Sequence, residues 1–296
     1  MNTDSIKAIN KINFKQSLMA YKKKPLSLLC KLIVWLAAII TIFALGYLIV
    51  YVLIKGVPHL TPELFAWEYN SDNVSMMPAI INTILMTLLS LLIAGPLGIF
   101  SAIYLVEYAK RGNKLVGIIR ITAETLTGIP SIVYGLFGML FFVTTLHMGY
   151  SLISGALTLA IMVLPVIMRT TEEALLAVPD SYREGSFGLG AGKLRTVFRV
   201  ILPSAMPGIL SGVILATGRI VGETAALIFT AGTVAKVPQS IFSSTRTLAV
   251  HMYSLSKEGL HTDQAYATAV VLLALVIIIN FISDAICSRK IDKDKE

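Results

Sequence analysis

The stretch LIVWLAAIITIFALGYLIVYVLI, residues 32–54, decides the fold class, because its 23 residues include no Lys, Arg, Asp or Glu. A bilayer core about 30 Å thick is crossed by about 20 helical residues, so this run is long enough to span a membrane. The whole chain is apolar: 55% of its 296 residues are hydrophobic, 14% are charged, and the mean hydropathy is +0.77. This composition excludes a water-soluble domain and predicts an all-α polytopic membrane protein.

Five more spans are predicted from the other long apolar runs. Residues 125–168 form a run of 44 positions without Lys, Arg, Asp or Glu. As one helix this run would measure about 66 Å, which suits two spans, and we place the turn between them at residues 147–151. The six predicted spans are residues 32–54, 79–105, 121–146, 151–168, 205–232 and 265–286.

Basic residues predict the orientation, because short segments rich in Lys and Arg stay on the cytoplasmic side. The N-terminal tail, residues 1–31, contains seven lysines, and the C-terminal tail, residues 287–296, is also rich in Lys and Arg. Both termini are therefore expected in the cytoplasm, as is the long loop 169–204. The net charge of +8 is mainly a signal of this topology, since the chain has no basic face interleaved with aromatic residues of the kind that binds nucleic acids.

The cytoplasmic loop 169–204 is predicted to form two short helices, with the first ending before Pro179 and the second beginning at Pro179 and Asp180. The second has an apolar side, so it either lies on anionic lipid headgroups or docks on a cytoplasmic partner. Its GLGAGK segment, residues 188–193, lacks the spacing of a phosphate-binding P-loop, and Leu194 replaces the hydroxyl that would bind magnesium. The chain is therefore expected to bind no nucleotide or metal of its own.

The same loop resembles the E-A-A…G…I-x-L-P segment of the permease subunits of bacterial ABC importers. Glu184 takes the first position of that motif, and Gly185 and Ser186 stand where two alanines are usual. Glycine is a poorer helix former than alanine by about 1 kcal/mol, so this helix is expected to be looser. The resemblance implies a type I importer permease fold. It also implies an ATPase-coupling role for Arg183, Glu184, Gly185, Ser186, Gly190, Leu202 and Pro203.

Two charges lie inside the fifth predicted span, in the segment ATGRIVGETAALIFTAG, residues 216–232. A charge at the centre of a membrane helix costs about 2.5–3.5 kcal/mol on insertion scales, so Arg219 and Glu223 need a reason to be there. At positions i and i+4 of one helix they could neutralise each other in a structural salt bridge. Alternatively, they line a solute path in which the guanidinium of Arg219 binds a tetrahedral oxyanion. Glu223 could then accept a hydrogen bond from protonated phosphate, which fully ionised sulfate cannot offer.

Three segments resemble signature segments of the phosphate-specific members of this permease family: residues 124–138, 218–232 and 245–259. The resemblance implies that Arg219, Glu223 and Thr224 line the path of inorganic phosphate through a bacterial cell membrane. It also implies three kinds of partner, namely a sister permease, two copies of an ATPase subunit that uses ATP and Mg²⁺, and an extracytoplasmic phosphate-binding protein. The chain itself is expected to be non-catalytic.

Three other functions share some of these features. A secondary transporter or channel would have similar spans, but it would not require the docking pattern of residues 184–203, and no inverted repeat relates the two halves of the chain. A membrane protease or phosphatase is disfavoured because the sequence contains no HExxH, GxSxG or CxxC pattern. A permease for another oxyanion, such as molybdate or sulfate, stays open.

The last outer loop, residues 233–264, carries several charged or titratable side chains. Such side chains are mostly exposed in folded proteins, so we expect them to be solvated rather than to contact a binding protein. They are Arg246, His251, Lys257, Glu258 and His261.

Overall fold

The computed structural model describes the backbone of residues 25–110 and 112–293 and the side chains of residues 26–110 and 112–282. Most of the predicted tails, residues 1–31 and 287–296, therefore lies outside the described residues. The chain divides into two units, residues 1–54 and 55–296. Almost all of α2 (Pro25–Gly56) belongs to the first unit, and its apolar side chains are exposed on every side of the helix. A helix that is apolar all round suits contact with lipid or with another membrane helix.

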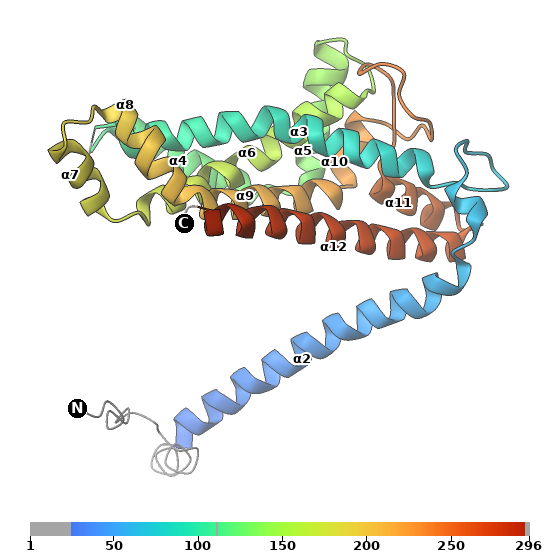
Figure 1. Cartoon of the computed structure of the whole chain (residues 1–296). Coiled ribbons are helices and arrows are strands. Elements are labelled where there is room, and N and C mark those ends of the chain that lie inside the picture. Colours follow the sequence, from blue (N-terminus) through green and yellow to red (C-terminus); the bar gives the residue numbers. More distant parts are fainter. Residues whose placement is uncertain (1–24, 111, 294–296) are drawn as a thin grey trace. The chain divides into compact units, whose positions relative to one another are not determined.

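The described part of the second unit is made of helices and connecting loops (Figure 1). Three long helices pack against one another, namely α3 (Met77–Ile103), α6 (Leu152–Leu176) and α9 (Leu202–Val221). The others are α4 (Lys114–Thr127), α5 (Ser131–Gly138), α7 (Asp180–Gly188), α8 (Lys193–Thr196), α10 (Ala225–Thr230), α11 (Leu248–Glu258) and α12 (Thr262–Lys293). π-helical turns extend α3 to Tyr108 and α5 to Thr145, and a third joins α8 to α9.

The main core lies where α3, α6 and α9 meet, and its largest members include Met86, Leu159, Met162, Ile167 and Ile220. The opposite face of α3 is apolar and exposed, as Leu88, Leu92 and Phe100 show. An apolar surface outside an apolar core is the arrangement that a lipid environment favours. The prediction of an all-α membrane protein is thus confirmed for the described residues.

Five helices in the described residues are long and apolar enough to cross a membrane, and a bent pair makes six if it counts as one span. The bent pair is α4 and α5, extended to Thr145, with an angle of 104° between the two helices. The predicted span 121–146 is therefore not one helix. The bend lies at Gly128-Ile129-Pro130, where proline has no N–H for the helical ladder and disfavours a helical conformation in the residue before it.

The predicted span 205–232 also consists of two helices, because α9 ends at Val221 and α10 begins at Ala225. α10 packs closely on α5, the second half of the bent pair. A Cβ added at Gly135 of α5 would lie 2.8 Å from Cα of Ala226, so only glycine permits this approach. The breaks in two membrane segments are therefore brought together.

The cytoplasmic loop differs from the predicted pair of short helices. α6 continues to Leu176, so the first predicted helix is the end of a span. The second ends at Gly188, and α8 leads through a π-helical turn at Val197–Ile201 into α9. One short helix, α7, therefore stands alone between two long ones.

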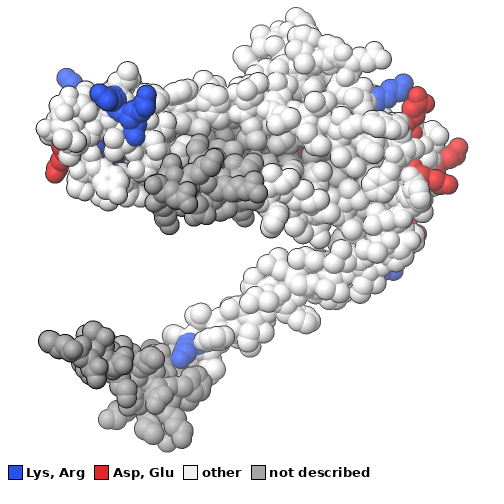
Figure 2. Space-filling view, viewed as in Figure 1, with Lys and Arg blue, Asp and Glu red and all other residues white. Residues whose placement is uncertain are grey.

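The two ends of the second unit differ in structure and charge. α7 and α8 lie at one end, and α11 lies near the opposite end (Figure 1). On the face drawn in Figure 2, basic side chains gather near α7 and α8, acidic ones gather mainly at the other end, and the surface between them is almost free of charge. A basic end of this kind is the one expected to face the cytoplasm.

Candidate functional site

Glu223 lies in the break between α9 and α10, where its carboxylate binds the local backbone. Its Oε1 accepts hydrogen bonds from the N–H groups of Thr224 and Ala226, each at 3.1 Å. Glu223 is only 9% exposed, and Thr224 is half-buried. The carboxylate therefore satisfies amides that the break leaves without helical partners.

Arg219 lies in the last turn of α9 and is half-buried, and it makes no ion pair with Glu223. The i,i+4 pair would need one continuous helix, whereas α9 ends at Val221. No carboxylate among the side chains of residues 26–110 and 112–282 lies within 4.0 Å of its guanidinium. The span thus holds a cation without an internal counter-ion.

Tyr134 connects this cation to the other break. Its hydroxyl lies within electrostatic range of Arg219 and donates a 2.8 Å hydrogen bond to the carbonyl oxygen of Leu126, near the end of α4. That carbonyl oxygen lies in the last turn of α4, where helical acceptors lose their partners. Through Tyr134, the α4–α5 break lies within electrostatic range of Arg219.

Arg183 fixes α7 to the ends of two spans. Its Nη2 and Nε bond Oε1 of Glu107, at 2.8 Å and 3.1 Å, and Glu107 follows α3. The same guanidinium donates to the carbonyl oxygens of Leu175 and Val178, at 3.0 Å and 2.9 Å, at the end of α6. The side chains of Arg183 and Glu107 are 16% and 8% exposed, so this ion pair is largely shielded from water. These contacts tie α7 to the ends of both α3 and α6.

The turn after α7 explains the glycine of the cytoplasmic motif. Gly190 has φ +81°, a left-handed conformation that glycine adopts without steric cost. The N–H of Gly190 bonds the carbonyl of Phe187, and the N–H of Ala191 bonds that of Ser186, which together form a Schellman cap. The Ser186 hydroxyl also lies 2.8 Å from the Thr196 hydroxyl of α8.

The other predicted coupling residues take different positions. Glu184 and Gly185 are exposed on α7, while Leu202 and Pro203 start α9, where proline needs no N–H partner. An apolar patch surrounds α7 and the turn after it, formed by the exposed side chains of Tyr182, Phe187, Leu189, Leu194 and Phe198.

Comparison with known proteins now decides the family. The family of binding-protein-dependent transport system inner membrane components matches residues 94–293, which include both breaks and the cytoplasmic loop. The chain belongs to this family. It is therefore a multi-pass membrane permease.

Two named relatives match most of this permease. It is 36% identical over 262 residues to the probable ABC transporter permease protein YqgI of Bacillus subtilis (strain 168), covering 82% of this chain and 88% of that protein. It is 33% identical over 259 residues to the phosphate transport system permease protein PstA of Pasteurella multocida (strain Pm70), covering 83% and 89%.

Solved structures confirm the type I importer permease fold. A chain of a bacterial alginate ABC transporter superposes with a TM-score of 0.65 at 14% identity, covering 91% of the permease and 97% of that chain. A chain of the inward-facing MetNI methionine ABC transporter gives a TM-score of 0.58 at 21% identity, covering 73% and 94%.

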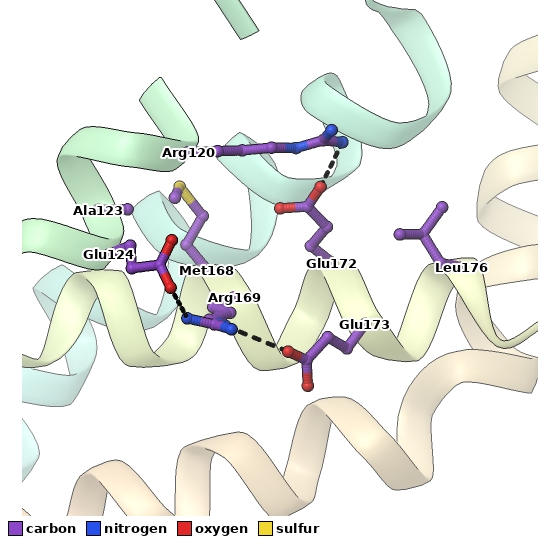
Figure 3. Close-up of a pocket in the computed structure, with 8 residues that line it drawn as sticks. All are labelled: Arg120, Ala123, Glu124, Met168, Arg169, Glu172, Glu173 and Leu176. Carbon is purple, nitrogen blue, oxygen red and sulfur yellow. Dashed lines mark hydrogen bonds and ion pairs between the residues drawn. The ribbon is translucent and has the colours of Figure 1, made fainter. Parts of the chain in front are cut away.

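Sequence reasoning missed the ion pairs that surround the cytoplasmic end of the permease. Figure 3 shows Arg120 of α4 paired with Glu172 of α6, and Arg169 placed between Glu124 and Glu173. These residues line a cavity of about 300 Å³. The pairing of Glu107 with Arg183 was also missed. Glu107 follows an apolar run and lies close to basic residues in the sequence, so it resembles an ordinary charge at the membrane interface.

Two outer-loop residues that were expected to be solvated are buried. Arg246 is 5% exposed and His251 is 0% exposed, whereas Lys257 and Glu258 are exposed and His261 is half-buried. Burial, followed by the nearby charge of Arg246, lowers the pKa of His251 to about 3 from its ordinary 6.5. His251 is therefore neutral at physiological pH.

The pKa of His251 predicts how stability depends on pH. Because the folded-state pKa lies below the unfolded value, the contribution of His251 is full above pH 6.5 and is lost as the pH falls toward 3. By pH 4 the loss is on the order of 3 kcal/mol. We expect His251→Gln to reduce the fall in melting temperature of the purified permease between pH 7 and pH 4. The exposed-site variant Glu258→Gln serves as control, and equal falls in His251→Gln and wild type would contradict the prediction.

Proposed function

We propose that the permease conducts inorganic phosphate as a membrane subunit of an ATP-driven, binding-protein-dependent importer. The observation that carries this proposal is the guanidinium of Arg219, which stands in an apolar span without a carboxylate partner among the described side chains. Such a cation keeps its proton and favours an anion, and its planar fork suits a tetrahedral oxyanion. Similarity to PstA of P. multocida, a phosphate transport system permease protein, supports phosphate as that oxyanion.

In this proposal the solute path passes the two helix breaks and is lined by Arg219, Glu223 and Thr224. Transporters commonly bind substrate where membrane helices are discontinuous, because unwound backbone supplies polar groups there. Arg219 attracts the anion. Glu223, whose carboxylate already binds two backbone amides, accepts a hydrogen bond only from a protonated oxyanion.

α7 and the turn after it would dock on a separate ATPase subunit, present in two copies, which binds ATP and Mg²⁺. The exposed apolar patch around α7 supports this role, since such patches mark interaction sites. The one basic residue within α7, Arg183, pairs inward with Glu107, so α7 itself offers no free cation to anionic lipid headgroups. The exposed basic residues nearby, Lys193, Arg195 and Arg199, belong to α8 and the turn after it. The residues proposed to couple the two subunits are Arg183, Glu184, Gly185, Ser186, Gly190, Leu202 and Pro203.

The remaining partners complete the importer in a bacterial cell membrane. A sister permease would face this chain and supply the other half of the path, and an extracytoplasmic phosphate-binding protein would deliver the solute. This chain would then catalyse no reaction of its own.

Competition during uptake tests the proposed substrate. The importer is reconstituted in liposomes with its ATPase and binding protein, and uptake of radiolabelled phosphate is measured with an excess of unlabelled phosphate, sulfate or molybdate. We expect unlabelled phosphate alone to compete. ATP-driven uptake of labelled sulfate or molybdate with no uptake of phosphate would instead make the chain a permease for that other oxyanion.

Glu223→Gln tests the selection of protonated phosphate. The amide oxygen of glutamine can still accept from the N–H groups of Thr224 and Ala226, so the fold is kept, but it is a weaker acceptor for a phosphate hydroxyl. Loss of one charged hydrogen bond, about 1.5 kcal/mol, should reduce the preference for phosphate over sulfate about tenfold. Glu258→Gln, at an exposed outer position, should leave the preference unchanged. An unaltered preference in Glu223→Gln would remove the selective role of Glu223.

A further inference from the structure

A second guanidinium, that of Arg246, is buried at the end of the permease opposite α7 and has no carboxylate partner among the described side chains. Its Nε and Nη2 atoms are inaccessible to solvent and make no hydrogen bond within the described part of the chain. These two atoms carry the parallel N–H groups on one edge of the guanidinium, the edge that binds carboxylate or phosphate in bidentate fashion. A buried charge that is neither paired nor hydrogen-bonded is strongly unfavourable, so another state of the protein must satisfy it.

The surroundings of Arg246 include no carboxylate within 4.0 Å among the described side chains. Its guanidinium carbon lies 4.6 Å from the centre of the Tyr69 ring, and the His251 ring meets Tyr69 edge-on at 6.0 Å. Neither ring nitrogen of His251 makes a hydrogen bond of normal geometry, although the ring lies close to the Val74 backbone. A neutral imidazole can donate one N–H without adding charge.

More polar atoms in the same segment lack partners. The hydroxyls of Thr245 and Thr247, both almost fully buried, make no hydrogen bond to described residues, and neither does Oδ1 of Asn82. Asn82 is held against this segment, because its Nδ2 donates to the carbonyl oxygens of Arg246 and Lys236. Buried polar groups are normally hydrogen-bonded, so several neighbouring groups without partners call for a ligand, an ion or ordered water.

We propose that Arg246 and His251, above the ring of Tyr69, form a second oxyanion site at the extracytoplasmic end of the permease, separate from Arg219. The site takes a small inorganic oxyanion such as phosphate, because the free edge of Arg246 offers two parallel donors. The proposed site does not depend on which anion the permease transports, since any tetrahedral oxyanion could accept hydrogen bonds from these N–H groups.

The site is closed in this structure and must open for an anion to enter. The adjoining loop contains Val74, a buried β-branched residue with φ +38°, a conformation that is strained for valine. Strained backbone of this kind clusters at ligand-binding and switch segments of proteins. Movement of the loop around Val74 would uncover both Tyr69 and His251, which pack against each other.

Hydrogen exchange and thermal unfolding of the full chain in lipid nanodiscs test the site. The amides of Arg246 and His251 report on it directly, because they bond the carbonyls of Val234 and Thr247. Inorganic phosphate at about ten times its Kd should slow exchange of this segment about tenfold, and chloride at equal ionic strength should not. The protection should persist in Arg219→Ala, which separates this site from the proposed path.

Arg246→Met gives the sharper result. Removing an unpaired buried charge should raise the melting temperature in the absence of anion and abolish the protection by phosphate. Lys257→Met, an exposed change in the same loop, should do neither. A variant Arg246→Met that is less stable than wild type, or that fails to fold, would overturn the proposal by showing that the guanidinium is already satisfied. Equal protection by chloride, or none by phosphate in the wild type, would overturn it too.

Discussion

Replacing Arg219 by alanine is expected to abolish phosphate import while leaving the protein in the membrane. A bidentate guanidinium makes two charged hydrogen bonds, each contributing about 1.5–3 kcal/mol, so uptake should fall about hundredfold or more. Insertion should not suffer, because the change removes a charge that costs about 2.5–3.5 kcal/mol at the centre of a membrane helix. Uptake of labelled phosphate is measured together with the amount of permease in the membrane.

Two further variants distinguish binding from charge alone. Arg219→Lys keeps the positive charge but not the planar fork, so it should import phosphate at an intermediate rate. Lys236→Ala removes an exposed cation from the outer loop and should have no effect. Import by Arg219→Ala at the wild-type rate, or failure of that variant to insert, would show that Arg219 serves helix packing instead.

Removing the buried partner of Arg183 is the second change with a large expected effect. Arg183→Ala leaves Glu107, 8% exposed, without its counter-charge, which should destabilise the permease by about 3–5 kcal/mol. It also frees the carbonyls of Leu175 and Val178, so that α7 is no longer tied to α3 and α6. Thermal unfolding should show the loss of stability, and transport-coupled ATP hydrolysis at a temperature where the variant stays folded should show the loss of coupling.

Asp180 provides the matched control, because Arg183 also pairs with this carboxylate at 3.1 Å. The side chain of Asp180 is 75% exposed, and exposed ion pairs contribute less than about 1 kcal/mol. Asp180→Asn should therefore change stability and coupling little. If Asp180→Asn and Arg183→Ala had equal effects, the buried pair with Glu107 would not be the link between α7 and the spans.

The sequence predicts the fold class and the number of spans because both depend on hydropathy and charge summed over many residues. It does not predict where the helices break. Pro96 and Pro165 stay inside α3 and α6, whereas Pro130 accompanies a sharp bend, and the break after Val221 contains no proline. Packing between helices decides such cases, and it depends on contacts distant in the sequence.

The same break explains why the site was only half predicted. Arg219 and Glu223 are identifiable as buried charges in an apolar run, but their pairing assumed one continuous helix. Arg246 and His251 show the converse case: titratable side chains outside the membrane spans are normally solvated, and only the tertiary structure reveals that these two are buried beside Tyr69. The partner of Arg183 was equally hidden, since Glu107 is far from it in the chain.

ATP hydrolysis by the assembled importer tests whether Arg219 links phosphate transport to the ATPase. The permease is reconstituted in lipid with a sister permease, its ATPase and a binding protein loaded with phosphate or with sulfate. Phosphate should stimulate hydrolysis, sulfate should not, and the stimulation should disappear in Arg219→Ala. An assembled complex whose hydrolysis does not respond to phosphate, or responds equally without Arg219, would contradict the account.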